Sequence, residues 1–260
     1  MPNRNSDMSK LPENHKFIDL SDYGRPAARI IANSLKETAF TPVQMTVLFI
    51  ISGLIAIACM LYGFYWAAAF FLILKSVLDA ADGELARIKN TPSYTGRYFD
   101  SIADIILNFL IFLALWHITD SLLIYALLAF LGIQLQGTLY NYYYVILRNK
   151  FNGDTTSRVF EDKTPIALEG ENQRNVNFLF MFYKLLYGGF DKIIYILDKK
   201  AISDKTFHNW FMTAVSTFGL GFQLLIISVM LVLGWTAFII PFFIGYTAMV
   251  VVFIGIRKLF

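Results

Sequence analysis

The chain has 260 residues, of which 57% are hydrophobic, 17% aromatic and only 16% charged, with a formal net charge of +3. Soluble domains carry about 25% charged residues, so this composition excludes a soluble globule, and a single cysteine excludes a disulfide scaffold. The small net charge gives no support to nucleic-acid binding, and the sequence predicts an all-α integral membrane protein.

The first 42 residues are polar and mixed in charge, which predicts a cytoplasmic arm rather than a cleavable signal peptide. Within this arm, Pro26 stands at a first helical turn, and the residues after it separate onto two sides of a helix. The apolar side holds Ala27, Ile30, Ile31 and Leu35, and the polar side holds Arg29, Asn33 and Lys36. The pattern predicts a helix on the membrane surface, with a plainly solvated helix as the alternative.

From residue 43 onward, apolar stretches are long enough to cross a bilayer, which takes about 20 residues. They divide at Gly63 and at Gly234 into six predicted spans: 43–61, 65–85, 98–117, 121–147, 210–233 and 237–256. We therefore predict an arm, 1–42, and a six-span catalytic domain, 43–260, with a cytoplasmic or interfacial insertion, 148–209. The apolar part of that insertion, 178–197, is interrupted by charges and is expected to lie at the interface.

The basic residues predict the orientation of the spans. The 22 Lys and Arg lie in the arm, in the two longer loops, after the last span, or on the adjoining ends of the spans. The turns near 62–65, 117–120 and 234–236 carry none. By the positive-inside rule, both termini and the longer loops are cytoplasmic.

Charged residues within the second and third spans are the main functional signal, because ionisable groups at membrane depth are costly and mark function by default. In chain order they form the pattern Asp79-x-x-Asp82-Gly83-x-x-Ala86-Arg87, eight residues, and Gly96-x-x-x-Asp100-x-x-x-Asp104. Each aspartate pair has i, i+3 or i, i+4 spacing and shares one helical face. A short cytoplasmic loop joins the two spans, so the pairs can face each other near the inner membrane surface.

Four carboxylates at close quarters require cations to stay ionised. Oxygen ligands with no nearby His or Cys favour Mg²⁺ or Mn²⁺, and two ions bridging a diphosphate fit this ligand set. Arg87 is placed to neutralise phosphate oxygens. The residues with little or no side chain, Gly83, Ala86 and Gly96, leave room for a nucleotide to approach the helix backbone.

Two neighbours have open roles. Lys75, four residues before Asp79, is expected either to pair with that carboxylate or to meet substrate phosphate. Asn108, four residues after Asp104, is expected either to orient that carboxylate by a hydrogen bond or to pack between helices. Apart from Lys75, little cationic charge lies deep in the spans, which disfavours a phosphorylated acceptor.

The motif resembles that of the CDP-alcohol phosphotransferases (CDP-alcohol phosphatidyltransferases), and all eight of its defining positions match with no departure in spacing. The resemblance implies a di-metal site at Asp79, Asp82, Asp100 and Asp104, with Asp104 also the general base. It assigns the nucleotide to Asp82, Gly83, Ala86, Arg87 and Gly96, and it implies a homodimer.

The implied reaction is attack by an alcohol on a CDP-linked donor with release of CMP, in phospholipid biosynthesis at the cytoplasmic side of the bilayer. The preferred donor is CDP-diacylglycerol, with a small polar alcohol as acceptor. The alternative is a CDP-choline or CDP-ethanolamine donor serving a lipid hydroxyl, because the motif covers only the CDP half. An ion-coupled transporter is the alternative from another class, although transporters place such acids near the midplane.

Overall fold

The computed structural model describes residues 11, 16–151, 161–204 and 207–259, and this part of the chain is helical with no strand. Its elements in chain order are η2 (Leu20–Asp22), α1 (Arg25–Leu35), α2 (Pro42–Leu61), α3 (Tyr65–Ile88), α4 (Tyr94–Thr119), α5 (Leu123–Lys150), α6 (Gln173–Leu197), α7 (Ala201–Asp204), α8 (Asn209–Val215), η3 (Ser216–Phe218), α9 (Leu220–Val232), α10 (Thr236–Tyr246) and α11 (Met249–Leu259). The all-α expectation is confirmed.

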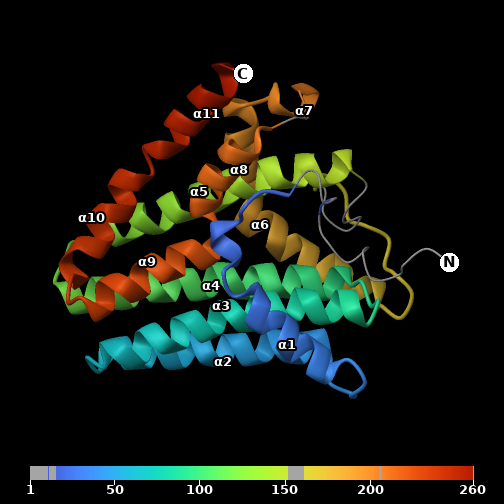
Figure 1. Ribbon diagram of the computed structural model, residues 1–260, viewed down its shortest axis with the longest axis horizontal. Helices are drawn as coiled ribbons and strands as arrows, with labels where there is room; N and C mark the ends of the chain where they lie inside the picture. The colour runs from blue at the N-terminus through green and yellow to red at the C-terminus, as the bar shows by residue number, and fades with distance from the viewer. Residues whose placement is uncertain (1–10, 12–15, 152–160, 205–206, 260) are drawn as a thin grey trace.

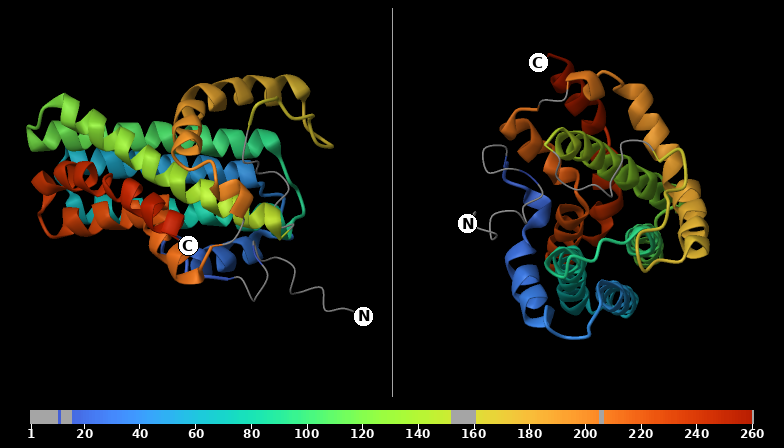
Figure 2. Two further views of the ribbon diagram at one scale, coloured as in Figure 1. Left: turned by 90° about the horizontal axis from the view of Figure 1, so that it is seen from above. Right: turned by 90° about the vertical axis from the view of Figure 1, so that its right-hand side faces the viewer.

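The long helices form a bundle in which α2, α3, α4 and α9 run along a common direction and α5 crosses them obliquely (Figure 1). Seen end-on, α1 and α6 run across that direction on opposite sides of the bundle (Figure 2). The main apolar core joins side chains of α2, α3, α4, α5, α9 and α10, including the fully buried Leu72, Leu115 and Phe243. The two helices that carry the aspartate motif, α3 and α4, therefore both contribute to the main apolar core.

Each of the six predicted apolar stretches coincides with a helix or a pair of helices. In the described residues, α2, α4, α5 and the α10–α11 pair are long and apolar enough to cross a membrane. The run from α8 to α9, bent by 55°, would be a fifth such stretch. The protein is a multi-pass membrane protein; α3 carries the charged motif and falls outside this set, so a count of six spans stays a prediction.

Short turns join the helices at the end of the bundle that carries few charges. They need left-handed backbone at Gly63 (φ 77°), Asp120 (φ 49°) and Gly234 (φ 72°), which explains the glycines at two of these positions. At the other end, Thr41 begins α2 with a capping box: its hydroxyl accepts from the Gln44 N–H, and the Gln44 side chain accepts from the Thr41 N–H.

Helix α1 is present, and it packs on the bundle through small residues; its place on the membrane surface stays a prediction. Ala28 and Ala32 are fully buried against the α2–α3 pair, whereas Ile30 is 73% exposed. Gly24, just before the helix, lets the backbone approach Val77 of α3, where an added Cβ would lie 3.0 Å from a Val77 methyl carbon. The sequence pattern did not predict this packing, because alanine and glycine have weak hydropathy signals while allowing close helix contact.

Candidate active site

Aspartates from α3 and α4 meet as their spacing predicts. One carboxylate oxygen from each of Asp79, Asp100 and Asp104 lies within 4.8 Å of those of the other two. Helix α4 begins at a Ser93 N-cap, whose hydroxyl accepts from the Gly96 N–H at 2.8 Å, and this start fixes Asp100 and Asp104 on the inward face. The structure thus brings three of the four predicted metal ligands together.

Asp82, the fourth predicted ligand, lies outside this trio. Its carboxylate accepts a hydrogen bond from the Thr46 hydroxyl of α2 at 2.5 Å. Thr46 is fully buried and also lies near the Pro42 carbonyl at 3.3 Å. The motif did not predict this partner, because Thr46 is a neutral residue on a different span.

Lys75 lies inside the carboxylate cluster. Its side chain is buried, and its ammonium forms an ion pair and hydrogen bond with the Asp104 carboxylate. A second ion pair joins it to Asp79 at 3.6 Å, and the ammonium also lies 4.8 Å from the centre of the Phe49 ring. The expected i, i+4 pair with Asp79 is therefore present, but the shorter contact is with the acid of the neighbouring helix.

Asn108 is 6% exposed one turn beyond Asp104, and in the described part of the chain it makes no hydrogen bond to that carboxylate. Of the two roles considered for it, packing between helices fits its position. The hydrogen bond that would orient Asp104 is absent.

The carboxylate trio fits a divalent cation. Asp100 Oδ1 is buried and has no hydrogen-bond partner among the described residues, so this oxygen is available to ligate a cation. Hard oxygen ligands are those that Mg²⁺ and Mn²⁺ prefer. Within the described residues, Lys75 forms ion pairs with Asp104 and Asp79 but none with Asp100, which leaves Asp100 as the open ligand.

The small residues and the arginine of the motif lie on α3 and at the start of α4. The Arg87 guanidinium folds back over Gly83, 3.5 Å from where a Cβ would stand. Gly96 lies in the first turn of α4, where an added Cβ would come 3.3 Å from the Ser93 hydroxyl. Arg87 also contacts Glu84 at 3.1 Å, a partner that the motif analysis did not consider.

Sequence reasoning missed the N-terminal segment 19–24, which docks beside the site. The Leu20 N–H donates to the Ser216 hydroxyl at 2.9 Å, and Tyr140 of α5 donates to the Asp19 carboxylate. Gly221 of α9 makes the approach possible, because a Cβ there would lie 2.0 Å from the Ser21 carbonyl oxygen. Gly219 also lies against Ser21, so these two glycines are the local sequence signal that could have indicated the docking.

Tyr23, at the end of η2, extends the same segment toward the cluster. Its hydroxyl is buried and makes no hydrogen bond of good geometry. Burial raises the pKa of this hydroxyl, and the nearby Ser76 hydroxyl and Lys75 ammonium oppose the shift without cancelling it. The Tyr23 hydroxyl is thus close to the Lys75 ammonium of the carboxylate cluster.

The insertion supports α4 from the opposite side. The Glu171 carboxylate accepts from the Thr95 N–H at 2.6 Å and from the Ser93 hydroxyl at 2.8 Å. Burial opposes ionisation of Glu171, but these hydrogen bonds outweigh it and lower its pKa. On α6, the Tyr187 hydroxyl donates to the Ser101 carbonyl at 2.8 Å, one residue after Asp100.

The match to known families agrees with this geometry. No curated protein matches the chain, but the model of the CDP-alcohol phosphatidyltransferase family matches residues 39–168, half of its length. The matched stretch contains α2 to α5 and every motif residue. Members are transferases of phosphate-containing groups, which contradicts the transporter alternative. The chain belongs to the CDP-alcohol phosphatidyltransferase family.

Proposed function

We propose that this protein transfers the phosphatidyl group of CDP-diacylglycerol to a small polar alcohol and releases CMP. The observation that carries the proposal is the trio of Asp79, Asp100 and Asp104 with Lys75 between two of its members. Family membership implies phosphatidyl transfer from a CDP-alcohol, and the identities of the donor and the acceptor are part of our proposal.

The metal would be Mg²⁺ or Mn²⁺, with two ions held by Asp79, Asp82, Asp100 and Asp104. When bound, these ions would neutralise the diphosphate and make CMP a better leaving group. Asp82 would have to give up or share its hydrogen bond from Thr46 in order to ligate. The buried and unpartnered Asp100 oxygen supports this ligand set.

Asp104 is the proposed general base. A base must be ionised to accept the proton of the attacking alcohol, and the adjacent Lys75 ammonium stabilises the negative charge of Asp104. General-base assistance contributes about 10²–10⁴ in rate. As the proton moves to Asp104, the alcohol oxygen attacks phosphorus and the bond to CMP breaks.

The nucleotide of the donor would lie on the small-residue surface of Gly83, Ala86 and Gly96, with Asp82 and Arg87 as its polar contacts. Arg87 already extends over Gly83, so its guanidinium is available to a phosphate in the same place. The acceptor would come from the aqueous side, and the lipid chains of the donor would stay in the bilayer.

The topology that we propose has six spans, with α3 and the bent α8–α9 run added to the four long apolar stretches. Both termini and the active site lie on the cytoplasmic side, where the basic residues gather. The arm 1–42 contributes α1 as an interfacial helix, and α6 within the insertion 148–209 lies along the membrane surface. A homodimer, as the family resemblance implies, completes the proposal.

The test is CMP release by the detergent-purified protein with Mg²⁺ or Mn²⁺. One arm supplies CDP-diacylglycerol with a mixture of polar alcohols, and the other supplies CDP-choline and CDP-ethanolamine with diacylglycerol. Metal-dependent CMP from the first arm supports the proposal, and mass spectrometry of the lipid product identifies the alcohol. Release from the second arm alone would replace the donor that we propose.

Asp104→Asn is the matched inactive variant, and we expect it to lose turnover by about 10²–10⁴ while CMP still binds. Asp120→Asn is its control, because Asp120 lies at the opposite end of α4 and asparagine tolerates its left-handed backbone. Retained activity in Asp104→Asn would remove Asp104 as the base.

A further inference from the structure

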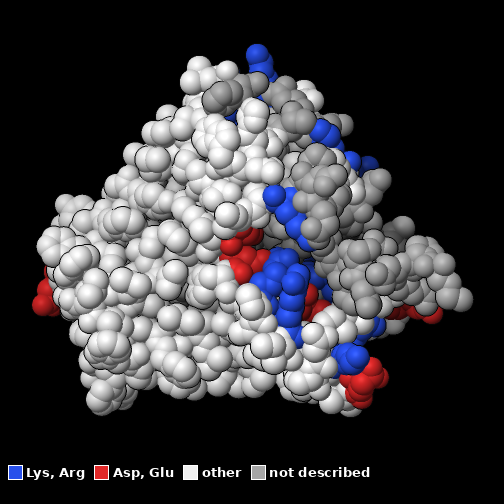
Figure 3. Space-filling view, viewed as in Figure 1, with Lys and Arg blue, Asp and Glu red and all other residues white. Residues whose placement is uncertain are grey.

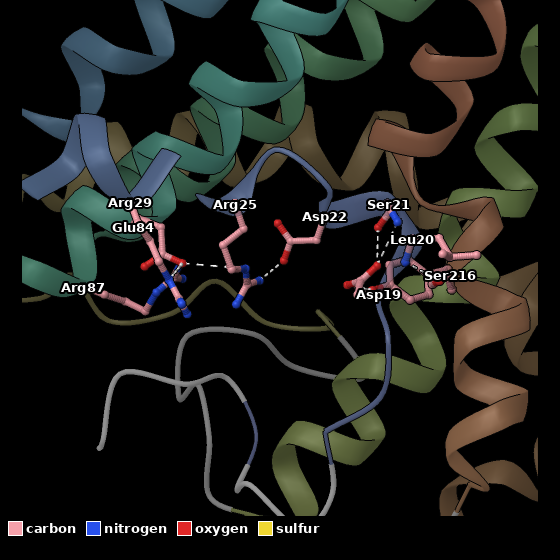
Figure 4. Close-up of polar contacts among 10 residues, drawn as sticks. Asp19, Leu20, Ser21, Asp22, Arg25, Arg29, Glu84, Arg87 and Ser216 are labelled. Carbon is pink, nitrogen blue, oxygen red and sulfur yellow. Dashed lines mark hydrogen bonds and ion pairs between the residues drawn. The ribbon is translucent and has the colours of Figure 1, made fainter. Parts of the chain in front are cut away.

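Three arginines converge on one buried carboxylate beside the start of α1. Glu84 of α3 is 3% exposed, and its Oε1 lies 3.1 Å from Arg87, 3.7 Å from Arg25 and 3.8 Å from Arg29. Two of these arginines come from α1, which the motif does not include. Figure 4 shows their guanidinium groups directed to the same side of α1 and α3.

The cluster is rich in unused donors. Despite these contacts, Glu84 Oε1 accepts no hydrogen bond of good geometry from the described part of the chain, and Arg87 Nε is buried there without a partner. The Arg29 side chain is 52% exposed and that of Arg87 is 30% exposed. A guanidinium offers five N–H donors, so the exposed parts of Arg29 and Arg87 have donors available to a ligand.

The cluster is also positively charged. Among the described residues, its one acidic partner besides Glu84 is Asp22, which pairs with Arg25. Three guanidinium groups thus face two carboxylates. In the space-filling view, blue atoms fill a hollow where α1 begins, with red atoms at its sides (Figure 3).

Anchoring of α1 is the simpler explanation, but it does not require three arginines. The helix already packs through Gly24, Ala28 and Ala32, and one arginine would be enough to compensate the buried Glu84 charge. The excess of positive charge and of donors is the pattern expected of an anion site. Guanidinium groups match phosphate oxygens in geometry and charge.

We propose that Arg25 and Arg29 form a phosphate-binding socket beside the carboxylate trio, bordered by Arg87, which it shares with the nucleotide site, with Glu84 holding the three arginines together when no ligand is bound. The ligand is a phosphate monoester or diester, carried by a phosphorylated acceptor alcohol or by an anionic phospholipid headgroup. The choice of these two sources of phosphate rests on the proposed function, whereas the phosphate site itself does not. It reverses the expectation that the acceptor lacks phosphate if the first source is correct.

The test uses the full-length protein in detergent, without divalent metal, and inorganic phosphate as the probe. Phosphate is expected to raise the melting temperature at constant ionic strength. The double variant Arg25→Gln/Arg29→Gln should bind phosphate at least about tenfold more weakly. The control Lys36→Gln, at the end of the same helix and beside only Glu37, should bind like the unaltered protein.

Glu84→Gln gives an effect of opposite sign and guards against a variant that simply misfolds. Loss of the competing carboxylate should tighten phosphate binding several-fold. A merely structural Glu84 would lower the melting temperature and leave the phosphate affinity unchanged, which would contradict the socket.

Two further arms identify the source of the phosphate. If it is the acceptor, the double variant loses activity toward phosphorylated alcohols and keeps it toward their dephosphorylated forms. If it is a lipid, the double variant loses the dependence of activity on anionic phospholipid in nanodiscs.

Two results would overturn the proposal. One is equal phosphate affinity in the double variant and the unaltered protein; the other is a parallel loss of CMP affinity, which would assign these arginines to the donor site. Failure of the proposed function is distinguishable, because absent CMP release with the expected phosphate affinities would leave the socket standing.

Discussion

The two aspartate-bearing helices are supported in different ways. On α3, the carboxylates are held from within the bundle: Lys75 pairs with Asp79, and Thr46 of α2 holds Asp82. On α4, Lys75 pairs with Asp104, but the helix is also supported by the insertion, where Glu171 caps its first turn and Tyr187 of α6 donates to a backbone carbonyl. The difference teaches that the aspartates of α3 depend on neighbours within the bundle, whereas those of α4 depend in addition on the insertion.

Removal of the inner cation should have the largest effect on this arrangement. Lys75→Met leaves Asp104 and Asp79 without their buried partner, and breaking such a pair costs about 3–5 kcal/mol. We expect turnover to fall at least about hundredfold and the melting temperature without metal to drop. Excess Mg²⁺ should recover more stability in the variant than in the unaltered protein, as thermal scans with and without metal would reveal. Equal scans would show that Lys75 does not balance the cluster.

Displacement of the N-terminal segment should have the next largest effect. Gly221→Ala places a Cβ 2.0 Å from the Ser21 carbonyl oxygen, and a backbone atom cannot yield without moving η2. We expect about a tenfold loss of turnover with CMP binding retained. The control Gly245→Ala has no atom within 4 Å of its new Cβ, and it should be neutral or stabilise by about 0.5–1 kcal/mol. Full turnover in Gly221→Ala would show that docking of the N-terminal segment 19–24 does not contribute to catalysis.

Weakening of the α4 support should have a moderate effect. Glu171→Gln loses a charged cap that accepts from the Thr95 N–H and the Ser93 hydroxyl, which is worth about 1–2 kcal/mol. Chemical denaturation should show this loss, with a few-fold fall in turnover. Glu169→Gln, two residues earlier and exposed, is the control. If Glu171→Gln is as stable as that control, Glu171 does not stabilise the start of α4.

The smallest effect on turnover is expected at Asp191 of α6. Burial and the Glu161 charge raise the pKa of its carboxyl to about 7, against the opposing charge of Arg97, with Tyr183 of the same helix nearby. The protonated form is therefore favoured by folding, so its stabilisation is complete below about pH 4 and is lost as the pH rises through about 7. Asp191→Asn should flatten this decline by about 1–2 kcal/mol in denaturation at pH 4–7.5. An unchanged slope of the free energy of unfolding against pH in Asp191→Asn would contradict this role of Asp191.

Much of the fold was predictable, because it depends on patterns that are local in sequence. Apolar length located the helices, and i, i+3 and i, i+4 spacing across a short loop brought Asp79, Asp100 and Asp104 together. The partner of Lys75 on α4 was not predictable, because it depends on how two helices are rotated against each other. The arginines of α1 were missed because small residues, which give little signal, orient that helix.

The docking of η2 on the far part of the chain has a consequence for the order of assembly. Leu20 and its partner Ser216 are 196 residues apart, so the contact forms only after nearly the whole domain has been synthesised. A nascent chain that has inserted α2 to α4 already possesses its aspartates, but η2 has no surface on α9 against which to dock. The N-terminal segment beside the cluster is then one of the last features to settle, which delays a complete site until the final helices have packed.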